Sequence, residues 1–396
     1  MSRLQIYDPR ERALVRAADG ALAVAAAVAR PFRRRARPAA PARILLLRLE
    51  RIGDLVMVLP AIRDVRALAP AAAIDLVVGG WNAALAGAIP SVSSVETLDA
   101  RWLGRNGRGT GVGRLLAAAR RWRTRRYDLA INFEPDIRSN LMLAASGAGW
   151  TAGWTSGGGG SLLDCALEYD GRAHTSSNAR RLVSSAFQRA APDSPLDLLT
   201  LPDDVRRAAC VRLGPGLQAP LVGVHASGGR PVKQWEPEKF AEVAQRLAVE
   251  RGATIVLTGS TADRALVGGI KKTIPARQVI DVSGEADLLL LAALLERLDL
   301  LITGDTGPMH LAAAVSTPIV AVFGPSDPRR YAPPGARIVR IDLPCSPCNR
   351  IRLPPARCKG HTPDCLAGIT ADAVFDAAVS VLDRASLRDA PGHATA

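Results

Sequence analysis

The N-terminal part of the sequence lacks a hydrophobic run long enough to cross a bilayer. Its apolar stretch from Ala21 to Ala29 is short and rich in alanine, whereas a spanning helix needs about 20 apolar residues. The order typical of a secretory signal peptide is missing too, because acidic Asp8 and Glu11 precede this stretch and an arginine cluster follows it. We therefore expect neither a membrane-spanning helix nor a cleaved leader in this segment.

The arginine cluster at 33–37 also lacks interleaved aromatic side chains. Residues 1–43 hold ten Arg against three acids, so they carry +7 of the formal net charge of +14. Without aromatics or an accompanying motif, nucleic-acid binding is not indicated. Apolar residues recur at helical spacing, at Leu14, Ala18, Leu22, Ala25 and Val28. Two hypotheses stay open: a helix with a basic patch on an anionic membrane surface, or a solvated tail.

The composition does not indicate a disordered chain. Hydrophobic residues make up 48% of the 396 residues and charged residues 22%, which is typical of globular proteins. Because this length exceeds what one hydrophobic core usually supports, we expect two domains. The predicted segments are a basic, amphipathic extension at 1–42, a first domain at 43–215, a second domain at 216–385 and a tail at 386–396.

Both expected domains alternate short apolar strands with helical segments. In the first domain, strands are expected at 44–49, 74–78 and 128–133. A helix with one apolar face opens at Gly53-Asp54. Residues 153–220 are rich in Gly and Pro and are interpreted as loops and an interdomain connection, apart from a helix at 178–189.

The same alternation restarts at Leu221. Strands are expected at 221–226, 254–257, 278–282, 298–303 and 319–323, with helices at 237–250, 262–272, 287–295 and 308–315. This order predicts two doubly wound parallel sheets of the Rossmann-like class, which face a central cleft. Ligands of such sheets bind beyond the carboxyl ends of the strands, so the strand-to-helix corners are the candidate site.

One such corner, LITGDTGPMH, gathers polar side chains around a turn. Asp305 and Thr306 lie at the turn, and His310, one of only five histidines, follows within the expected helix. Pro308 suits the first helical turn, whose free N–H groups favour an anion. The alternative interpretation is a capping turn without further function, in which Thr306 or Gly307 is the N-cap.

Two further corners contain residues suited to a nucleotide diphosphate. Lys233, one of only five lysines, follows the Gly-rich stretch that begins at Ser227, and a lysine beside closely approaching backbone is a recurrent phosphate-binding arrangement. Asp263 lies at an expected helix start, where it can accept hydrogen bonds from ribose hydroxyls or merely cap the helix.

On the first domain, Asp54 is either a first-turn acid that compensates the helix dipole or a carboxylate that accepts a proton from an attacking hydroxyl.

With these motifs, the chain from about Arg43 to Leu382 resembles glycosyltransferase family 9, the heptosyltransferases of lipopolysaccharide core assembly. The resemblance rests on ILLLRLERIGDLVMVLPAIR, on SGGRPVKQWEPEKFAEVA and on ITGDTGPMHLAAAVSTPIVAVFGPSDP. It implies a GT-B fold and an inverting transfer from a nucleotide-sugar, usually an ADP-heptose, with no cofactor required.

The resemblance also implies roles for single residues. It implies that Asp54 is the catalytic base and that Lys233 neutralises the diphosphate. Arg138 is expected to help hold a phosphorylated or acidic glycolipid acceptor. Glu50 and Arg51 depart from the family, because many members have small residues there. The donor-binding residues expected from the corners and the resemblance together are Lys233, Ser227, Asp263, Asp305, Thr306, Gly307 and His310.

Four cysteines follow the spacing C-x2-C-x9-C-x6-C in the loop 345–365, which also contains His361. They are Cys345, Cys348, Cys358 and Cys365. By ligand type they match a structural zinc site. Reduced thiols and a local disulfide remain alternatives, although a cytoplasmic location argues against the disulfide.

The sequence as a whole therefore predicts an inverting glycosyltransferase at the inner face of the bacterial cytoplasmic membrane. Its expected partners are an ADP-sugar donor, a lipopolysaccharide-core or similar glycolipid acceptor, and the anionic membrane surface. A nucleotide-sugar epimerase on the same fold is one alternative. A non-catalytic sugar-binding or scaffold protein is another, against which the presence of Asp54, Lys233 and Asp305 argues.

Overall fold

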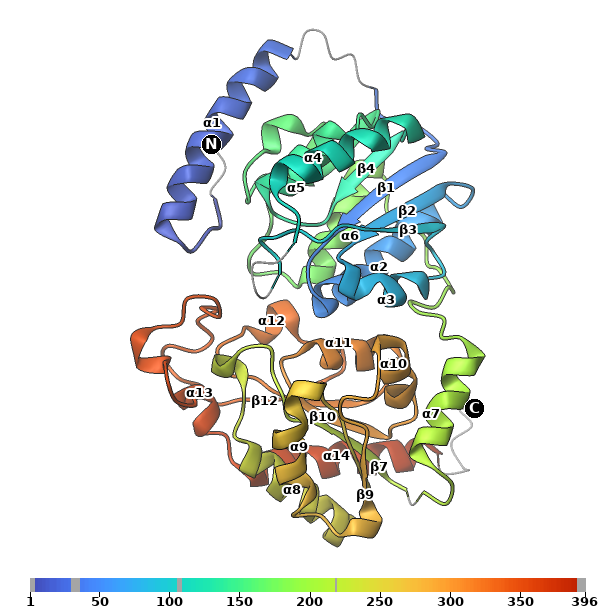
Figure 1. The fold of residues 1–396 in the computed structure, drawn as a ribbon, viewed down its shortest axis with the longest axis vertical. Helices are drawn as coiled ribbons and strands as arrows, with labels where there is room; N and C mark the ends of the chain where they lie inside the picture. Colours follow the sequence, from blue (N-terminus) through green and yellow to red (C-terminus); the bar gives the residue numbers. More distant parts are fainter. Residues whose placement is uncertain (1–3, 30–35, 105–108, 218, 390–396) are drawn as a thin grey trace. The chain divides into compact units, whose positions relative to one another are not determined.

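The computed structural model describes residues 4–29, 36–104, 109–217 and 219–389 (Figure 1). The chain separates into two compact units, Met1–Thr200 and Leu201–Ala396. The arginines at 33–35 of the predicted N-terminal extension and residues 390–396 of the predicted tail lie outside the described residues. The domain boundary expected between residues 215 and 216 stays a prediction.

The first unit is built on a parallel sheet of six strands in the order β3-β2-β1-β4-β5-β6. The strands are β1 (Arg43–Arg48), β2 (Ala73–Val78), β3 (Ser94–Thr97), β4 (Leu129–Asn132), β5 (Trp150–Trp154) and β6 (Cys165–Leu167). The α-helices are α1 (Pro9–Ala29), α2 (Ile52–Leu68), α3 (Ala83–Gly87), α4 (Val112–Arg121), α5 (Ile137–Ala145) and α6 (Thr175–Phe187). Helix α2 packs against α6, and α4 packs against α5 (Figure 1).

Strand β1 occupies the centre of this sheet because its sequence is apolar on both faces. It pairs in parallel with β2 on one side and β4 on the other, with Ile44 opposite both Ile74 and Leu129. A central parallel strand is covered on both faces, so it needs a continuous apolar run and not an alternating one. The carboxyl end of β1 therefore lies beside that of β4, and the chain turns there into α2.

The second unit repeats this architecture with the strand order β12-β11-β10-β7-β8-β9. Its strands are β7 (Leu221–His225), β8 (Thr254–Leu257), β9 (Val279–Asp281), β10 (Leu300–Gly304), β11 (Ile319–Val322) and β12 (Arg337–Val339). Its α-helices are α7 (Asp203–Leu213), α8 (Pro237–Arg251), α9 (Arg264–Lys271), α10 (Leu288–Glu296), α11 (Gly307–Ala314), α12 (Pro328–Tyr331), α13 (Asp364–Ala367) and α14 (Ala371–Asp389). Counted along the chain, both sheets have the order 3-2-1-4-5-6 of dinucleotide-binding folds, which reverses between the first and fourth strands.

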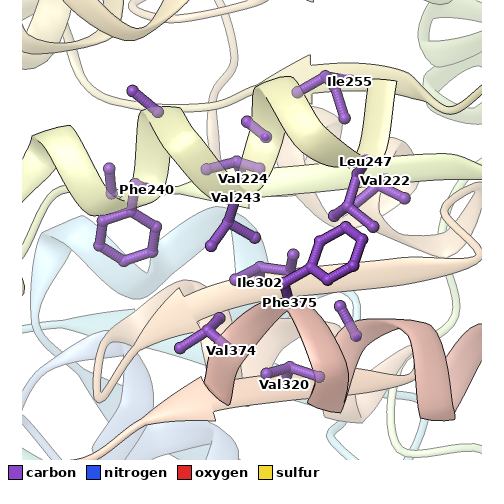
Figure 2. Packing of buried hydrophobic residues seen from close by; sticks show 14 of the residues in the cluster. Val222, Val224, Phe240, Val243, Leu247, Ile255, Ile302, Val320, Val374 and Phe375 are labelled. Atoms are coloured by element: carbon purple, nitrogen blue, oxygen red, sulfur yellow. The ribbon is translucent and has the colours of Figure 1, made fainter. Parts of the chain in front are cut away.

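The core of the second unit lies between this sheet and the helices α8 and α14 (Figure 2). Val222 of β7 and Ile302 of β10 are fully buried there. Trp235 packs edge-to-face on Phe240 of α8, with ring centroids 4.8 Å apart, which is a favourable aromatic arrangement. This packing anchors the corner that follows β7.

Helix α1 forms where the apolar spacing predicts a helix, and one side of it packs on the first unit. The Gln5 N–H donates to the Ser156 carbonyl at 2.9 Å, and the Gly159 N–H donates to the Asp19 carboxylate at 2.6 Å. Beside this contact, Val15 approaches Gly158 so closely that a Cβ there would meet it at 2.8 Å. Among the described helices, none has the length and apolar content to cross a membrane.

Several elements lie in segments for which the sequence predicts neither a helix nor a strand. Strand β5 comes before the glycines at 157–160 and β6 comes after them, and α7 lies inside the Pro-rich segment whose sequence predicts an interdomain connection. The helix expected at 262–272 begins as a 3-10 turn at Thr261–Asp263 before α9 starts.

Candidate active site

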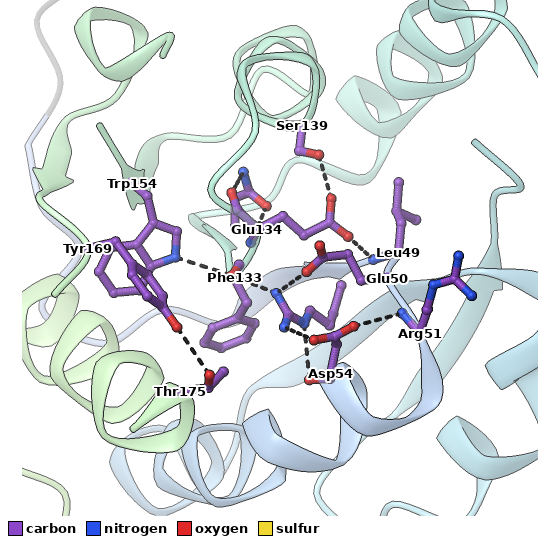
Figure 3. A network of polar contacts seen from close by, with 12 residues as sticks. Leu49, Glu50, Arg51, Asp54, Phe133, Glu134, Ser139, Trp154, Tyr169 and Thr175 are labelled. Atoms are coloured by element: carbon purple, nitrogen blue, oxygen red, sulfur yellow. Dashed lines mark hydrogen bonds and ion pairs between the residues drawn. The ribbon is translucent and has the colours of Figure 1, made fainter. Parts of the chain in front are cut away.

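Asp54 lies in the first turn of α2, directly beyond the carboxyl end of β1. Its Oδ2 accepts a hydrogen bond from the Arg51 backbone N–H at 3.3 Å, and its Oδ1 lies 3.5 Å from Nη2 of Arg48 (Figure 3). The side chain is 32% exposed. Capping of α2 therefore engages only Oδ2 of Asp54. The carboxylate still reaches solvent, so a substrate hydroxyl can approach it, as general-base catalysis requires.

The Arg48 side chain is buried at the end of β1, with only 3% exposed. Its Nη1 lies 2.8 Å from Oε2 of Glu50 and donates to the Phe133 carbonyl at 2.9 Å. Its Nε donates to the Asp54 carbonyl oxygen at 3.1 Å. Burial lowers the pKa of this guanidinium, but the carboxylates of Glu50, Asp54 and Glu134 outweigh it and raise the pKa. Arg48 is therefore a buried cation.

Glu134 is a second buried ionisable group, beyond the carboxyl end of β4. One of its oxygens accepts from Ser139 Oγ at 2.5 Å, and the other accepts from the Leu49 N–H (Figure 3). Burial raises the pKa of this carboxyl, although Arg48 and Ser139 act in the opposite direction. Sequence reasoning missed Arg48 and Glu134. The available signal was a charged residue at the end of each of two apolar strands.

Arg138, the predicted acceptor-binding residue, already has carboxylate partners in the structure. Its guanidinium donates twice to Asp136, at 2.9 and 2.5 Å, and lies 3.7 Å from Glu11 of α1. It also stacks over Trp102, with 4.5 Å between the guanidinium carbon and the ring centroid. Asp136 is the N-cap of α5 and fixes Arg138 at the start of that helix.

In the second unit, Lys233 and Asp305 form an ion pair. The Lys233 Nζ lies 2.7 Å from Oδ2 of Asp305, and the two side chains are 21% and 9% exposed. Lys233 comes from the corner after β7, and Asp305 comes from the corner after β10. Because β7 and β10 are the first and fourth strands of this sheet, the pair lies at its topological switch point, where open α/β sheets bind ligands.

Two other side chains, Ser326 and His310, interact with Asp305 of this ion pair. Burial would raise the pKa of Asp305, but Lys233 outweighs it, and Ser326 and His310 lower the pKa further. Ser326 was not expected from the sequence. Thr306 is the N-cap of α11, although its hydroxyl bonds to Thr303 Oγ1 at 3.1 Å and not to the helix. The alternative of Gly307 as N-cap is therefore wrong, since Gly307 is the first residue of α11.

A buried histidine links the corners after β7 and β8. His225 Nδ1 lies 2.9 Å from Thr258 Oγ1, and Nε2 lies 3.0 Å from Ser227 Oγ. Burial lowers the pKa of His225 to about 4, although nearby Asp263 opposes this shift. Asp263 accepts from the Ser260 N–H at 2.7 Å and so caps its turn. Hydrogen bonds to Asp263 from Ser260 and Ser227 offset its burial and lower its pKa.

The predicted donor-binding residues thus form two groups at the strand-to-helix corners of the second unit. One contains Lys233, Asp305 and His310, with Thr306 and Gly307 on the same turn. The other contains Ser227 and Asp263. Asp54 and Arg138 belong to the first unit.

The model of glycosyltransferase family 9 (heptosyltransferase) matches residues 115–354, which is more than half of the chain. This chain belongs to glycosyltransferase family 9. It is therefore a glycosyltransferase, as the sequence motifs predict.

Lipopolysaccharide heptosyltransferase 2 of Escherichia coli is 27% identical over 314 residues, which cover 76% of this chain and 88% of that protein. Lipopolysaccharide heptosyltransferase 1 of Pseudomonas aeruginosa is 27% identical over 318 residues, which cover 77% and 86%.

Solved structures of similar proteins share the fold of this family 9 enzyme. The family 9 glycosyl transferase of Veillonella parvula superposes with a TM-score of 0.73 at 25% identity, over 87% of this chain and 98% of that one. The ADP-heptose lipopolysaccharide heptosyltransferase II of E. coli gives a TM-score of 0.70 at 23% identity, over 87% and 99%. The predicted GT-B class, with two Rossmann-like parallel sheets, is confirmed.

The zinc site predicted in the cysteine loop of this family 9 enzyme finds no support. All six cysteines are free thiols. The described residues include no group of three or more His, Cys, Asp or Glu side chains placed to hold a metal ion. Burial, and then the neighbouring Cys348, Cys358 and Cys345, together raise the pKa of Cys365 to about 11.

Proposed function

We propose that this family 9 enzyme is an inverting heptosyltransferase, which moves heptose from an ADP-sugar to a lipopolysaccharide-core or similar glycolipid acceptor. The relatives named above are lipopolysaccharide heptosyltransferases, and they align over most of their own length. The observation that carries the proposal is the Lys233–Asp305 ion pair at the switch point of the second sheet. It holds a cation where such sheets bind phosphate-linked ligands.

In this proposal the second unit binds the donor. The Lys233 ammonium, held by Asp305, neutralises the diphosphate. The N–H groups of Thr306 and Gly307, at the start of α11, face the same anion and add the positive end of a helix dipole. Ser227 and Asp263 recognise the ribose, and His310 contributes to the sugar site. These residues need no cofactor, because the nucleotide-sugar is itself the reactant.

The proposed base is Asp54 in the first unit. An acceptor hydroxyl oxygen attacks the anomeric carbon and gives its proton to the Asp54 carboxylate. The bond between that carbon and the diphosphate oxygen breaks, and ADP leaves with the electron pair while Lys233 stabilises its charge. Attack from the side opposite the leaving group inverts the configuration. The partial exposure of Asp54 supports this role, because a fully paired and buried carboxylate would be a poor base.

We assign the acceptor to the region around Arg138. A phosphorylated or acidic glycolipid would interact with its guanidinium by replacing Glu11, whose contact at 3.7 Å is longer than that of Asp136. The Trp102 ring beneath the guanidinium holds it in place during this exchange.

We also propose that the enzyme works at the inner face of the cytoplasmic membrane and that α1 lies on that surface. Leu14, Val24 and Val28 are 73%, 68% and 68% exposed, whereas Asp19 on the same helix is bonded to the first unit. An anionic lipid surface would cover these apolar side chains and attract the arginine-rich segment 1–43.

The test is direct transfer with the purified chain. ADP-heptose and heptose-deficient lipopolysaccharide should yield free ADP and an acceptor heavier by one heptose, with inverted anomeric configuration by NMR. GDP- and UDP-sugars should be poor donors. An epimerised ADP-sugar in the absence of acceptor would instead indicate the epimerase alternative. Binding of ADP-heptose without any turnover would indicate a non-catalytic protein.

A further inference from the structure

A single buried arginine connects three elements at the switch point of the first sheet. Arg48 ends β1, and its guanidinium contacts the Phe133 carbonyl beyond β4 and the first turn of α2 at Asp54 (Figure 3). Removing a cation from water costs several kcal/mol unless partners compensate it. Such a residue is costly as a mere space-filler in a strand whose other buried members are Ile and Leu.

Arg48 contacts Asp54 twice, once through the backbone and once through the side chain. Its Nε donates to the Asp54 carbonyl at 3.1 Å, and its Nη2 lies 3.5 Å from Oδ1. Arg51 N–H restrains the other carboxylate oxygen, Oδ2. The Asp54 carboxylate is therefore oriented from both sides while part of it remains exposed.

Several carboxylates share the Arg48 guanidinium, so its distance to the Asp54 carboxylate is longer than that of a close ion pair. Glu50 makes the shorter contact, at 2.8 Å, and the buried carboxyl of Glu134 adds a third acid to the network. A guanidinium shared in this way orients Asp54 without engaging it in the short, bidentate pair that would reduce its availability to accept a proton.

We propose that Arg48 is a positioning residue, which holds the Asp54 carboxylate in the geometry for proton abstraction. This inference rests on the proposed function, in which Asp54 is the base. Arg48 itself is too buried to touch the substrate. Its loss should leave substrate binding intact and slow the chemical step, because misplacement of a reacting group by about 1 Å can cost about 10²-fold in rate.

The experiment compares steady-state kinetics of the full chain and its variants with ADP-heptose and heptose-deficient lipopolysaccharide. In Arg48→Ala, kcat should fall by about 10²-fold with the Kd for ADP-heptose and the KM for the acceptor unchanged. The truncated side chain leaves a cavity of guanidinium shape. Guanidinium at a sub-denaturing concentration should therefore restore part of kcat, and urea, which is neutral and of similar shape, should not.

A matched control separates positioning from a general loss of stability in α2. Arg180 of α6 forms an ion pair with the buried Asp64 of the same helix α2, at 2.6 Å. Arg180→Gln should lower the melting temperature and leave kcat unchanged below it. If Arg48→Ala does not fold, the variant Arg48→Met/Glu134→Gln removes both buried charges together and should show the same fall in kcat.

Three outcomes would overturn the inference. They are unchanged kcat in the Arg48 variants, a loss expressed in Kd or KM instead of kcat, or equal rescue by urea and guanidinium. If the unsubstituted chain transfers no heptose from ADP-heptose, the proposed function fails, which differs from an active enzyme that is indifferent to Arg48.

Discussion

At the scale of single residues, the two candidate carboxylates differ in how strongly a cation holds them. Asp305 is 9% exposed and lies 2.7 Å from Lys233, whereas Asp54 is 32% exposed and lies 3.5 Å from Arg48. A short, buried ion pair stabilises the ionised carboxylate and makes it a poor proton acceptor. Asp305 is therefore suited to orient Lys233, and Asp54 is the better candidate for the base.

The first prediction concerns Asp54. Asn has nearly the same shape and can still accept from the Arg51 N–H, but it cannot take a proton. Asp54→Asn should lower kcat by about 10²–10⁴-fold, the usual contribution of a general base, with the donor Kd unchanged. Steady-state kinetics at saturating donor and acceptor measure the effect. A variant with near-normal kcat would reduce Asp54 to a capping residue.

The second prediction concerns Lys233. Charge-assisted hydrogen bonds contribute about 1.5–3 kcal/mol, so Lys233→Ala should weaken ADP binding by at least about tenfold. Because the change leaves Asp305 largely buried without its cation, it should also lower the melting temperature. The variant Lys233→Met/Asp305→Asn removes both charges, so it should recover stability without recovering ADP affinity. Calorimetry and thermal melting separate these effects, and unchanged ADP affinity in Lys233→Ala would contradict the assignment.

The sequence predicted those site residues that lie close in the chain to the end of a predicted strand. Asp54 and Lys233 could be predicted from local sequence. Asp54 lies within a few residues of the end of an apolar run, and Lys233 follows a Gly-rich stretch that comes after another apolar run. The contact between Arg48 and Phe133 depends on the pairing of β1 with β4, which no local pattern encodes. Ser326 joins Asp305 for the same reason, from a corner later in the chain.

At the scale of elements, strands buried on both faces were predictable and the irregular connections were not. The run at 44–49 gives β1 with a shift of one residue, because a continuous apolar run has few other stable environments. Helix α7 is polar and enclosed between prolines, and it is helical in a segment whose sequence is typical of a loop. Its packing on α10 supplies the stabilisation that its own sequence does not.

The element-scale prediction concerns α1. Replacing Leu14, Val24 and Val28 with Gln should reduce binding to anionic vesicles by at least about tenfold, because each buried apolar side chain contributes about 1.5–3 kcal/mol. Vesicle flotation at low and high salt measures the change. The control replaces Val211 of α7 and Val249 of α8, which are exposed elsewhere on the surface, by 80% and 64%. Equal flotation of both variants would show that α1 is not the membrane contact.

At the scale of the whole molecule, the two units use one topology for two different polar networks. Each sheet has its network at the reversal of strand order, between its first and fourth strands. In the first unit a single buried cation is surrounded by Glu50, Asp54 and Glu134. In the second unit the neutral, buried His225 and the Lys233–Asp305 ion pair lie at the carboxyl ends of the strands. The fold thus determines the place of each network, and the side chains determine its chemistry.

The last prediction follows from that histidine and concerns the pH dependence of stability. In the folded second unit the pKa of His225 is about 4, whereas an unfolded histidine titrates near about 6.5. The unfolded state therefore binds a proton first as the pH falls, so the stability that is fully present above about pH 6.5 is lost between about 6.5 and 4. The loss should be on the order of 3 kcal/mol.

Urea unfolding of the full chain followed by tryptophan fluorescence, to which Trp235 contributes from the second unit, measures this loss. The variant His225→Gln keeps hydrogen-bonding capacity toward Ser227 or Thr258 but cannot titrate. Whatever its stability at pH 7.5, its free energy of unfolding should change less between pH 6.5 and 5 than that of the unsubstituted chain, and Asp263 and Asp305, whose pKa values are lowered, act only at lower pH. An equal slope in both proteins would mean that folding does not lower the pKa of His225, so that the folded second unit would carry a further cation below that pKa.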